Sequence, residues 1–333
     1  MTDIKLQQKK SILSIDNLKV YFPLKRRLPW QTKRYVKAVN GVSFDVFEGE
    51  TLGLVGESGC GKSTLLRALI GLNAPATDGE IIYKSHNLAQ YKAFDPRWQQ
   101  IRCDIQMIFQ DPFASLNPRM TIGNIIAEPL KVHQPQLSSE KRKQLVEEMM
   151  RLVGLSASFI NRYPHQFSGG QCQRVGIARA LILKPKILLC DEPVSALDVS
   201  IQAQVVNLLR QLQKELKLTI IFVAHNLSVV KHISDRIVVM YLGRIMELSQ
   251  AKILCEQPQH PYTKALLSAV PIPDPKLERN KKIQILEGDL PSPVNPPSGC
   301  VFRTRCPCAS DQCAKMIPPL TQVQHNLSAC IHT

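Results

Sequence analysis

The sequence predicts an α/β protein with a mainly parallel sheet, an antiparallel β subdomain, a helical subdomain and a loop-rich C-terminal part. Three observations support this fold class. Apolar segments typical of buried strands alternate with helical segments in the second half of the chain, which is the pattern of a parallel α/β sheet. A glycine-rich loop follows one apolar strand and precedes a helix. The last quarter holds 12 of the chain's 23 prolines, which favours loops and short elements.

The expected elements follow in chain order. Residues 12–22 alternate apolar and polar side chains, as a half-buried strand does. Residues 36–56 contain two or three short strands separated by turn-forming pairs, and apolar positions then recur at mostly helical spacing from about 97 to 183. Further strands are expected at 186–190, 218–224 and 236–242, with a helix at 201–216.

The change of composition divides the chain into two expected domains. Residues 1–255 form the main domain, with the helical subdomain at about 97–183 inside it. Residues 256–333 form a C-terminal extension that is rich in proline and carries five of the ten cysteines.

The charge and hydropathy of the chain limit its function. Lys and Arg number 42 and Asp and Glu number 27, so the net charge is +15. Such an excess suits an anionic partner, which can be a nucleotide, a nucleic acid or a membrane surface. The sequence contains no apolar stretch of about 18 residues that would span a bilayer, and its start lacks the apolar core of a signal peptide, so we expect a cytoplasmic location.

Residues 56–63 fit the pattern G-x-x-x-x-G-K-[ST] between an apolar strand and an apolar-periodic helix. Glycines let the backbone curl so that its N–H groups face phosphates, and the helix N-terminus adds its dipole. Lys62 is expected to reach the β- and γ-phosphates, and the Ser63 hydroxyl to bind Mg²⁺. The alternative is a glycine-rich turn with a chance lysine. The predicted nucleotide-binding residues here are Gly56, Glu57, Ser58, Gly59, Cys60, Gly61, Lys62, Ser63 and Thr64.

Polar residues at the ends of other strands predict the rest of the catalytic site. Asp191 and Glu192 end an apolar strand, so Asp191 can hold Mg²⁺ and Glu192 can orient and deprotonate the attacking water. His225 follows the next strand and can contact the γ-phosphate, although a lone histidine at a strand end is usually structural. Gln110 is equally ambiguous by itself and can sense Mg²⁺ and water.

A second glycine-bearing helix start lies at Ser168-Gly169-Gly170-Gln171. Taken by itself it is an ordinary helix cap. Helix N-termini also bind phosphate, and this chain already has one phosphate loop. Two anion sites in one chain make sense if the second serves the nucleotide of a neighbouring subunit.

With these motifs in this order, the chain resembles the ABC ATPases. The resemblance assigns Gln110 to the Q-loop, residues 168–171 to the signature, residues 195–198 to the D-loop and His225 to the switch histidine. Phe167 stands where the signature more often has leucine. The family implies a head-to-tail dimer that binds two ATP molecules with Mg²⁺, each between one phosphate loop and the other signature. It also implies that Asp198 contacts nucleotide and that adenine stacks on an aromatic residue, for which we favour Phe22 over Tyr21 and Tyr35.

Further segments resemble the ATPases of oligopeptide and dipeptide importers, namely residues 110–119, 162–165, 260–263 and 290–307. This group implies a second, related ATPase subunit, two integral membrane permease subunits and, indirectly, a periplasmic peptide-binding protein. No nucleic acid is expected as a partner. The implied location is peripheral, on the cytoplasmic face of the inner membrane. Alternatives are dipeptides, haem, nickel or antimicrobial peptides as cargo, or a soluble ABC ATPase that acts on nucleic acid or ribosomes.

By the same resemblance, four cysteines of the extension imply a [4Fe–4S] cluster. Thiolate tetrads suit iron–sulfur or zinc, and the spacing does not separate the two. The alternative is a set of scattered reduced thiols, and Cys308 could substitute for one ligand. The implied ligands are Cys300, Cys306, Cys313 and Cys330.

Overall fold

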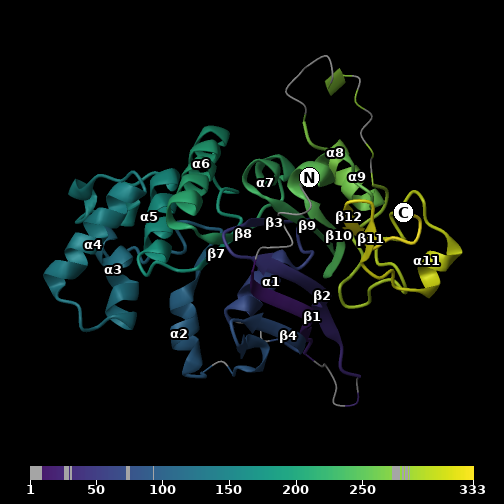
Figure 1. Cartoon of the computed structure of the whole chain (residues 1–333), viewed down its shortest axis with the longest axis horizontal. Coiled ribbons are helices and arrows are strands. Elements are labelled where there is room, and N and C mark those ends of the chain that lie inside the picture. Colours follow the sequence, from purple (N-terminus) through teal and green to yellow (C-terminus); the bar gives the residue numbers. More distant parts are fainter. Residues whose placement is uncertain are drawn as a thin grey trace. The chain divides into compact units, whose positions relative to one another are not determined.

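Figure 1 shows the fold of the chain in a computed structural model. The structure describes residues 10–333 except 26–29, 31, 73–75, 93, 272–277, 280, 282–283 and 285. The chain divides into two compact units. Unit 1 comprises residues 1–47, 52–93 and 225–333, and unit 2 comprises residues 48–51 and 94–224.

The first sheet of unit 1 is antiparallel and has the order β2-β1-β4-β5. Two long strands, β1 (Ser11–Pro23) and β2 (Tyr35–Phe47), form most of it. β4 (Asp78–Tyr83) pairs with the other edge of β1 and is followed by β5 (His86–Asn87) and the short 3₁₀ helix η2 (Leu88–Gln90). Alternating side chains of β1 are buried, among them Leu13 and Ile15, as the period-two pattern predicts.

The second sheet of unit 1 has the order β11-β12-β10-β9-β3. β3 (Thr51–Val55), whose first residue is counted with unit 2, runs parallel to β9 (Arg236–Tyr241), and the other pairs are antiparallel. Helices accompany the two sheets. The remaining elements are β10 (Arg244–Gln250), β11 (Thr321–Val323), β12 (Asn326–Ser328), α1 (Lys62–Leu69), α7 (Leu227–Ile233), α8 (Ala251–Glu256), α9 (Pro261–Ser268) and α11 (Asp311–Lys315).

Unit 2 contains a parallel set of strands, β8-β7-β6, and most of the long helices (Figure 1). β7 is buried at every position because its residues before Asp191 are apolar and both neighbours pair with it. On α2 the indole of Trp98 is 3% exposed, and the guanidinium of Arg102 lies 5.5 Å from its ring centre. The elements are α2 (Arg97–Asp104), β6 (Ile105–Ile108), α3 (Ile122–His133), α4 (Ser139–Leu152), η3 (Ala157–Phe159), η4 (Pro164–Gln166), α5 (Gly169–Leu181), β7 (Ile187–Asp191), α6 (Val199–Leu216) and β8 (Thr219–Val223).

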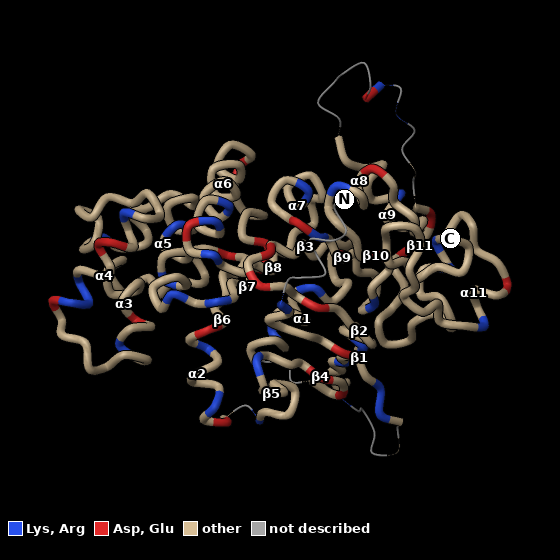
Figure 2. The backbone as a smooth tube through the Cα atoms, viewed as in Figure 1, with Lys and Arg blue, Asp and Glu red and all other residues tan. Residues whose placement is uncertain are grey.

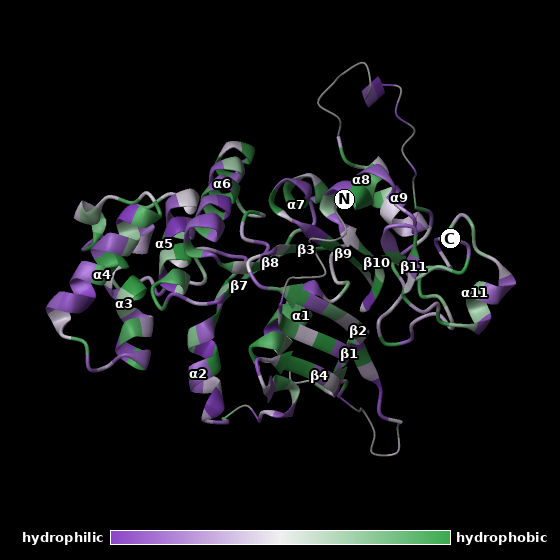
Figure 3. Ribbon diagram, in the orientation of Figure 1, coloured by the Kyte–Doolittle hydropathy of each residue, from purple (hydrophilic) through white to green (hydrophobic). Residues whose placement is uncertain are grey.

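Hydropathy and charge follow the division into buried strands and polar helix faces. Figure 3 shows hydrophobic residues concentrated in the strands, whereas α2 is hydrophilic over most of its length. Lys and Arg occur in both units rather than on a single element (Figure 2). Among the described residues, none of the helices has the length and apolarity that crossing a bilayer requires.

The structure confirms the α/β fold class and most of the predicted strands. The predicted strand at 218–224 corresponds to β8 and the one at 236–242 to β9. The mostly helical region holds one strand that was not predicted, β6, whose four residues pair in parallel with β7. The domain boundary at 255 stays a prediction, because the two compact units divide the chain elsewhere.

Candidate nucleotide-binding site

The glycine-rich loop of residues 56–63 joins β3 to α1 in unit 1. α1 begins at Lys62, directly after Gly61. The first N–H groups of a helix have no partner within the helix and can bind an anion. The loop therefore has the strand–loop–helix setting in which this motif binds phosphate.

The two glycines that define the motif occupy positions where a side chain does not fit. Gly61 has φ 106°, and a Cβ atom there would lie 2.1 Å from the carbonyl oxygen of Ala38. At Gly56 a Cβ atom would lie 2.2 Å from the carbonyl oxygen of Met240. Because backbone atoms cannot yield as a flexible side chain does, only glycine permits this close approach.

Lys62 lies inside the loop and is 4% exposed. Its Nζ atom donates hydrogen bonds to the carbonyl oxygens of Gly56 (2.8 Å) and Glu57 (3.0 Å). The thiol of Cys60 is fully buried beside it, with Sγ 3.8 Å from Nζ, and burial raises the pKa of this thiol. The lysine thus places a positive charge at the centre of the curled backbone.

In unit 2 the structure brings Gln110 and Glu192 together. Asp191 is the last residue of β7 and is buried, and Glu192 follows it. Gln110 lies two residues after β6, the parallel neighbour of β7, and its Nε2 atom donates a hydrogen bond to Glu192 Oε2 over 3.0 Å. Carboxyl ends of adjacent parallel strands meet at one sheet edge, which explains the juxtaposition.

The backbone of Glu192 has the left-handed value φ 45°. This conformation costs a non-glycine residue about 1–3 kcal/mol and is common at functional sites. Its N–H donates to the carbonyl oxygen of Val223 (3.1 Å), and its carbonyl oxygen accepts from the N–H (3.2 Å) and hydroxyl (3.0 Å) of Ser195. These bonds fix the backbone of Glu192 directly after β7 and so position its carboxylate.

The predicted signature forms the N-terminus of α5. The Ser168 Oγ atom accepts from the N–H of Gln171 (3.4 Å), and the Gln171 side chain accepts from the N–H of Ser168 (3.0 Å). This reciprocal pair is a capping box. A Cβ atom at Gly170 would lie 2.5 Å from Cγ2 of Ile201, so this glycine lets α5 and α6 approach closely.

Two other predicted residues have clear structural roles. Asp198 caps α6: its Oδ1 atom accepts from the N–H of Ile201 (3.0 Å) and the hydroxyl of Ser200 (2.7 Å). These hydrogen bonds, led by the one from Ser200, lower the pKa of the Asp198 carboxyl. His225 is exposed and directly precedes Asn226, which caps α7. The nucleotide-contacting roles expected for Asp198 and His225 stay predictions.

The structure therefore distributes the predicted residues over both units. The phosphate loop and His225 belong to unit 1, whereas Gln110, Asp191, Glu192 and the signature belong to unit 2. The three candidate aromatic residues for adenine, Phe22, Tyr21 and Tyr35, lie on paired ends of β1 and β2, and all are half-buried. The hydroxyl of Tyr21 donates to Asn40 Oδ1 over 2.5 Å, and the choice of Phe22 stays a prediction.

The tail cysteines do not form a metal site within the described residues, where no group of three or more His, Cys, Asp or Glu side chains can hold a metal ion. Burial raises the pKa of the Cys300 thiol and that of Cys306, the latter to about 11. Cys313 Sγ lies 3.5 Å from His332 Nε2 and 3.6 Å from the hydroxyl of Ser310. The arrangement of the described side chains therefore does not support the predicted cluster.

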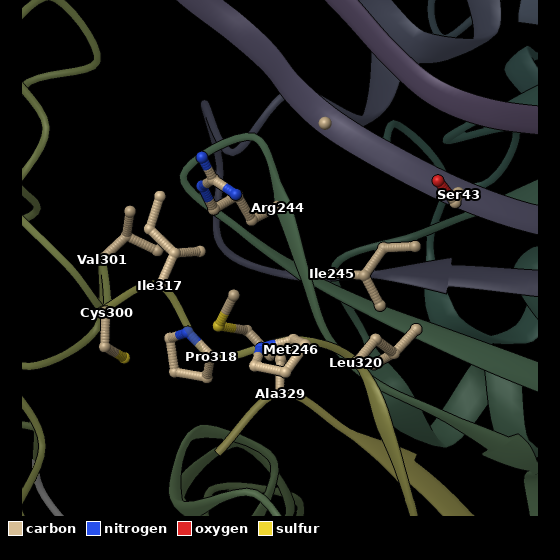
Figure 4. Close-up of a pocket in the computed structure, with 12 residues that line it drawn as sticks. Ser43, Arg244, Ile245, Met246, Cys300, Val301, Ile317, Pro318, Leu320 and Ala329 are labelled. Carbon is tan, nitrogen blue, oxygen red and sulfur yellow. The ribbon is translucent and has the colours of Figure 1, made fainter. Parts of the chain in front are cut away.

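A cavity of about 240 Å³ lies beside these cysteines (Figure 4). Strands β2 and β10 line one side of it, with Arg244 and Met246 among the lining side chains. The tail lines the other side with Cys300, Ile317 and Pro318. None of the predicted nucleotide-binding residues lines this cavity.

Two contacts to the phosphate loop come from residues that the sequence reasoning did not select. The hydroxyl of Tyr262 accepts a hydrogen bond from the N–H of Glu57 over 2.9 Å. Nη1 of Arg305 lies 2.7 Å from Glu57 Oε2. The only sequence signals were the His-Pro-Tyr-Thr segment at 260–263 and the position of Arg305 beside Cys306.

Comparison with known families identifies the class of protein that this fold and these motifs define. A family model described as ABC transporter matches residues 39–195, which include the phosphate loop, the signature and Glu192. A second model, described as the C-terminal region of oligopeptide/dipeptide transporters, matches residues 246–313. With the relatives below, these matches show that the chain belongs to the ABC transporter family, in its oligopeptide/dipeptide transporter group.

Relatives match nearly the whole chain. The oligopeptide transport ATP-binding protein OppF of Salmonella typhimurium is 61% identical over 98% of this chain and 97% of its own length. OppF of Escherichia coli is 60% identical over 96% of each chain. Among solved structures, a dimeric ATP-binding cassette in a post-hydrolysis state with ADP and phosphate is 29% identical, with a TM-score of 0.63, and covers 72% of this chain and 98% of that one.

These likenesses confirm the predicted ABC-type ATPase fold and the predicted membership of the oligopeptide/dipeptide group. The chain is an ATP-hydrolysing protein, and ATP with Mg²⁺ is the nucleotide cofactor of its family. They do not favour the alternative of an ATPase that acts on nucleic acid or ribosomes.

Proposed function

We propose that this chain energises the import of oligopeptides across the bacterial inner membrane by hydrolysing ATP. The observation that carries the proposal is the 61% identity to OppF, which extends over 98% of the chain and therefore includes the C-terminal extension as well as the ATPase motifs. The chain would associate peripherally with the cytoplasmic face of the membrane.

The catalytic roles follow from the chemistry of the residues. Lys62, held inside the phosphate loop, would exchange its bonds to two loop carbonyls for bonds to the β- and γ-phosphates. Ser63 and Asp191 offer the oxygen donors that Mg²⁺ prefers, and the bound ion would neutralise phosphate charge. Glu192 would accept the proton of the attacking water, with its carboxylate oriented by Gln110. His225 would donate to the γ-phosphate.

The signature is proposed to serve a second subunit. Its glycines and the helix N-terminus at the start of α5 suit a phosphate, while the nucleotide of this chain binds at its own phosphate loop. We therefore propose a head-to-tail pair with a related, non-identical ATPase, two membrane permease subunits that respond to its closure, and a periplasmic peptide-binding protein that delivers cargo to them.

The Glu192→Gln variant tests the catalytic assignment. Glutamine keeps the size of the side chain but cannot accept the proton, so ATP binding persists while hydrolysis falls by about 10²- to 10³-fold. Binding of ATP and its turnover are measured in transporter reconstituted into vesicles, together with peptide uptake. Glu148→Gln, at an exposed position of α4, is the matched control. Normal hydrolysis and uptake by Glu192→Gln would show that Glu192 is not the base.

A [4Fe–4S] cluster, or a zinc ion, on the tail cysteines stays a hypothesis that rests on family resemblance. Its support is that Cys300, Cys306 and Cys313 lie in the matched extension, which ends before Cys330. Iron and zinc analysis of protein purified without oxygen tests it, with visible charge-transfer absorbance as the cluster's signature. Metal-free, fully folded protein that retains ATP binding would rule out a structural metal.

A further inference from the structure

Glu57, the second residue of the phosphate loop, is held by groups from the last third of the chain. Its backbone N–H donates to the Tyr262 hydroxyl at 2.9 Å, and its carboxylate pairs with Arg305 at 2.7 Å. Its carbonyl oxygen accepts from Lys62 Nζ. All of these residues lie in unit 1. The backbone and the side chain of Glu57 are therefore both restrained.

The two residues that hold Glu57 are themselves fixed by an aromatic cluster of Tyr241, Tyr262 and Phe302. Tyr262 and Phe302 are fully buried, and their ring centres lie 5.2 Å apart. Tyr241 packs edge to face against both, at 4.9 and 5.2 Å. The N–H of Arg305 donates to the carbonyl oxygen of Phe302, so the buried ring fixes the turn that presents the guanidinium. Packing of this kind leaves few alternative rotamers.

The negative charge of the Glu57 carboxylate is neutralised by Arg305. The motif allows any residue at this position, so phosphate chemistry does not require a carboxylate there. A negative charge in a loop that binds a polyanion opposes binding unless a cation neutralises it. Arg305 is 10% exposed and Glu57 is 29% exposed, so solvent screens this pair less than a fully exposed one.

We propose that Arg305 and Tyr262 are positioning residues for the nucleotide: they hold the entrance of the phosphate loop in its binding shape, and Arg305 neutralises Glu57. The inference rests on nucleotide binding at residues 56–63. It assigns the C-terminal extension a direct role in ATP affinity. Substitution of Arg305 exposes the phosphates to the charge of Glu57, whereas removal of both charges restores binding.

The test measures the dissociation constant of Mg-ADP for the full-length protein by titration calorimetry. We expect Arg305→Gln to weaken Mg-ADP binding roughly tenfold, a modest factor because the Arg305–Glu57 ion pair is partly exposed to solvent. The double variant Glu57→Gln/Arg305→Gln binds within about threefold of wild type, because no unpaired charge remains. Tyr262→Phe keeps the ring but removes the acceptor for the Glu57 N–H, and it weakens binding by a smaller factor. Arg305→Lys, which keeps the charge without the forked geometry, lies between Arg305→Gln and wild type.

Arg303→Gln is the matched control, because Arg303 lies in the same turn but its Nε atom donates to the carbonyl oxygen of Ser298. The thermal midpoint of each variant shows whether the fold persists. If Arg305→Gln binds Mg-ADP as tightly as Arg303→Gln, or if the double variant is no better than the single one, the inference is wrong. If neither the wild-type protein nor Lys62→Ala binds nucleotide, the proposed nucleotide site at residues 56–63 is wrong, which is a different failure from that of the Arg305 proposal.

Discussion

Two glycines of the signature helix α5 predict stability changes of opposite sign. A Cβ atom at Gly170 would lie 2.5 Å from Cγ2 of Ile201 on α6. A Cβ atom at Gly176, further along the same helix, meets no atom within 4 Å outside the helix backbone, although Gly176 is buried. Gly176→Ala therefore stabilises unit 2, and Gly170→Ala destabilises it.

The magnitudes follow from two contributions. In a helix interior, alanine is favoured over glycine by about 1 kcal/mol, and burial of one methyl group adds up to about 0.8 kcal/mol. Gly176→Ala then raises the free energy of unfolding by about 1–2 kcal/mol. At Gly170 the helix term is smaller, since this is the first turn of α5. Overpacking against Ile201 costs about 1–3 kcal/mol, so the net change is a loss of about 1–2 kcal/mol.

Equilibrium unfolding in guanidinium chloride measures both variants, with equal m-values as the condition for comparing midpoints. The double variant Gly170→Ala/Ile201→Ala provides a further check, because it removes the atom that the new methyl group meets. Its coupling energy relative to the two single variants should be favourable. Changes of the same sign for Gly170→Ala and Gly176→Ala would refute the packing argument.

Two further predictions concern the buried polar network of unit 1. Burial lowers the pKa of His260 from 6.5 to about 4. As the pH falls, the unfolded chain therefore takes up a proton before the folded chain does, and the free energy of unfolding falls by about 3 kcal/mol between pH 6.5 and 4. His260→Asn, which keeps a capping acceptor, should flatten this slope in pH-dependent unfolding, and parallel slopes would contradict the assignment. The Glu247 carboxylate accepts hydrogen bonds from the N–H groups of Gln259 (2.8 Å) and His260 (3.0 Å) and from Asn326 Nδ2 (2.7 Å). Glu247→Gln sets an NH₂ group against one of these donors and lowers the free energy of unfolding by about 1–3 kcal/mol, measured by thermal unfolding. An unchanged thermal midpoint would show that the network relaxes.

Sequence patterns predicted the elements whose conformation is decided by residues that are close together in the chain. The phosphate loop was visible because its strand, glycines and helix are contiguous, and β7 and β8 were visible as apolar runs. β6 was missed because four residues within a helical region carry too weak a signal, and pairing with β7 decides their conformation.

Contacts between distant residues could not be predicted in this way. Arg305 and Glu57 are separated by 248 positions, and no periodicity records their pairing. The cysteine spacing, in contrast, predicted more than the structure supports. It suggested a tetrad of ligands, yet spacing does not fix the directions in which thiols point, and no group of three or more described His, Cys, Asp or Glu side chains is placed to hold a metal ion.

The environments of the two tryptophans give the chain a built-in optical probe. Trp98, on α2 of unit 2, is 3% exposed, whereas Trp30, in unit 1, is 79% exposed. An indole that is already surrounded by water changes its emission little when the chain unfolds, so the red shift on denaturation originates from Trp98. Tryptophan fluorescence therefore reports the opening of unit 2, while the near-ultraviolet circular dichroism of the packed Tyr241 and Tyr262 rings reports unit 1. A difference between the two transitions would reveal whether the units melt together.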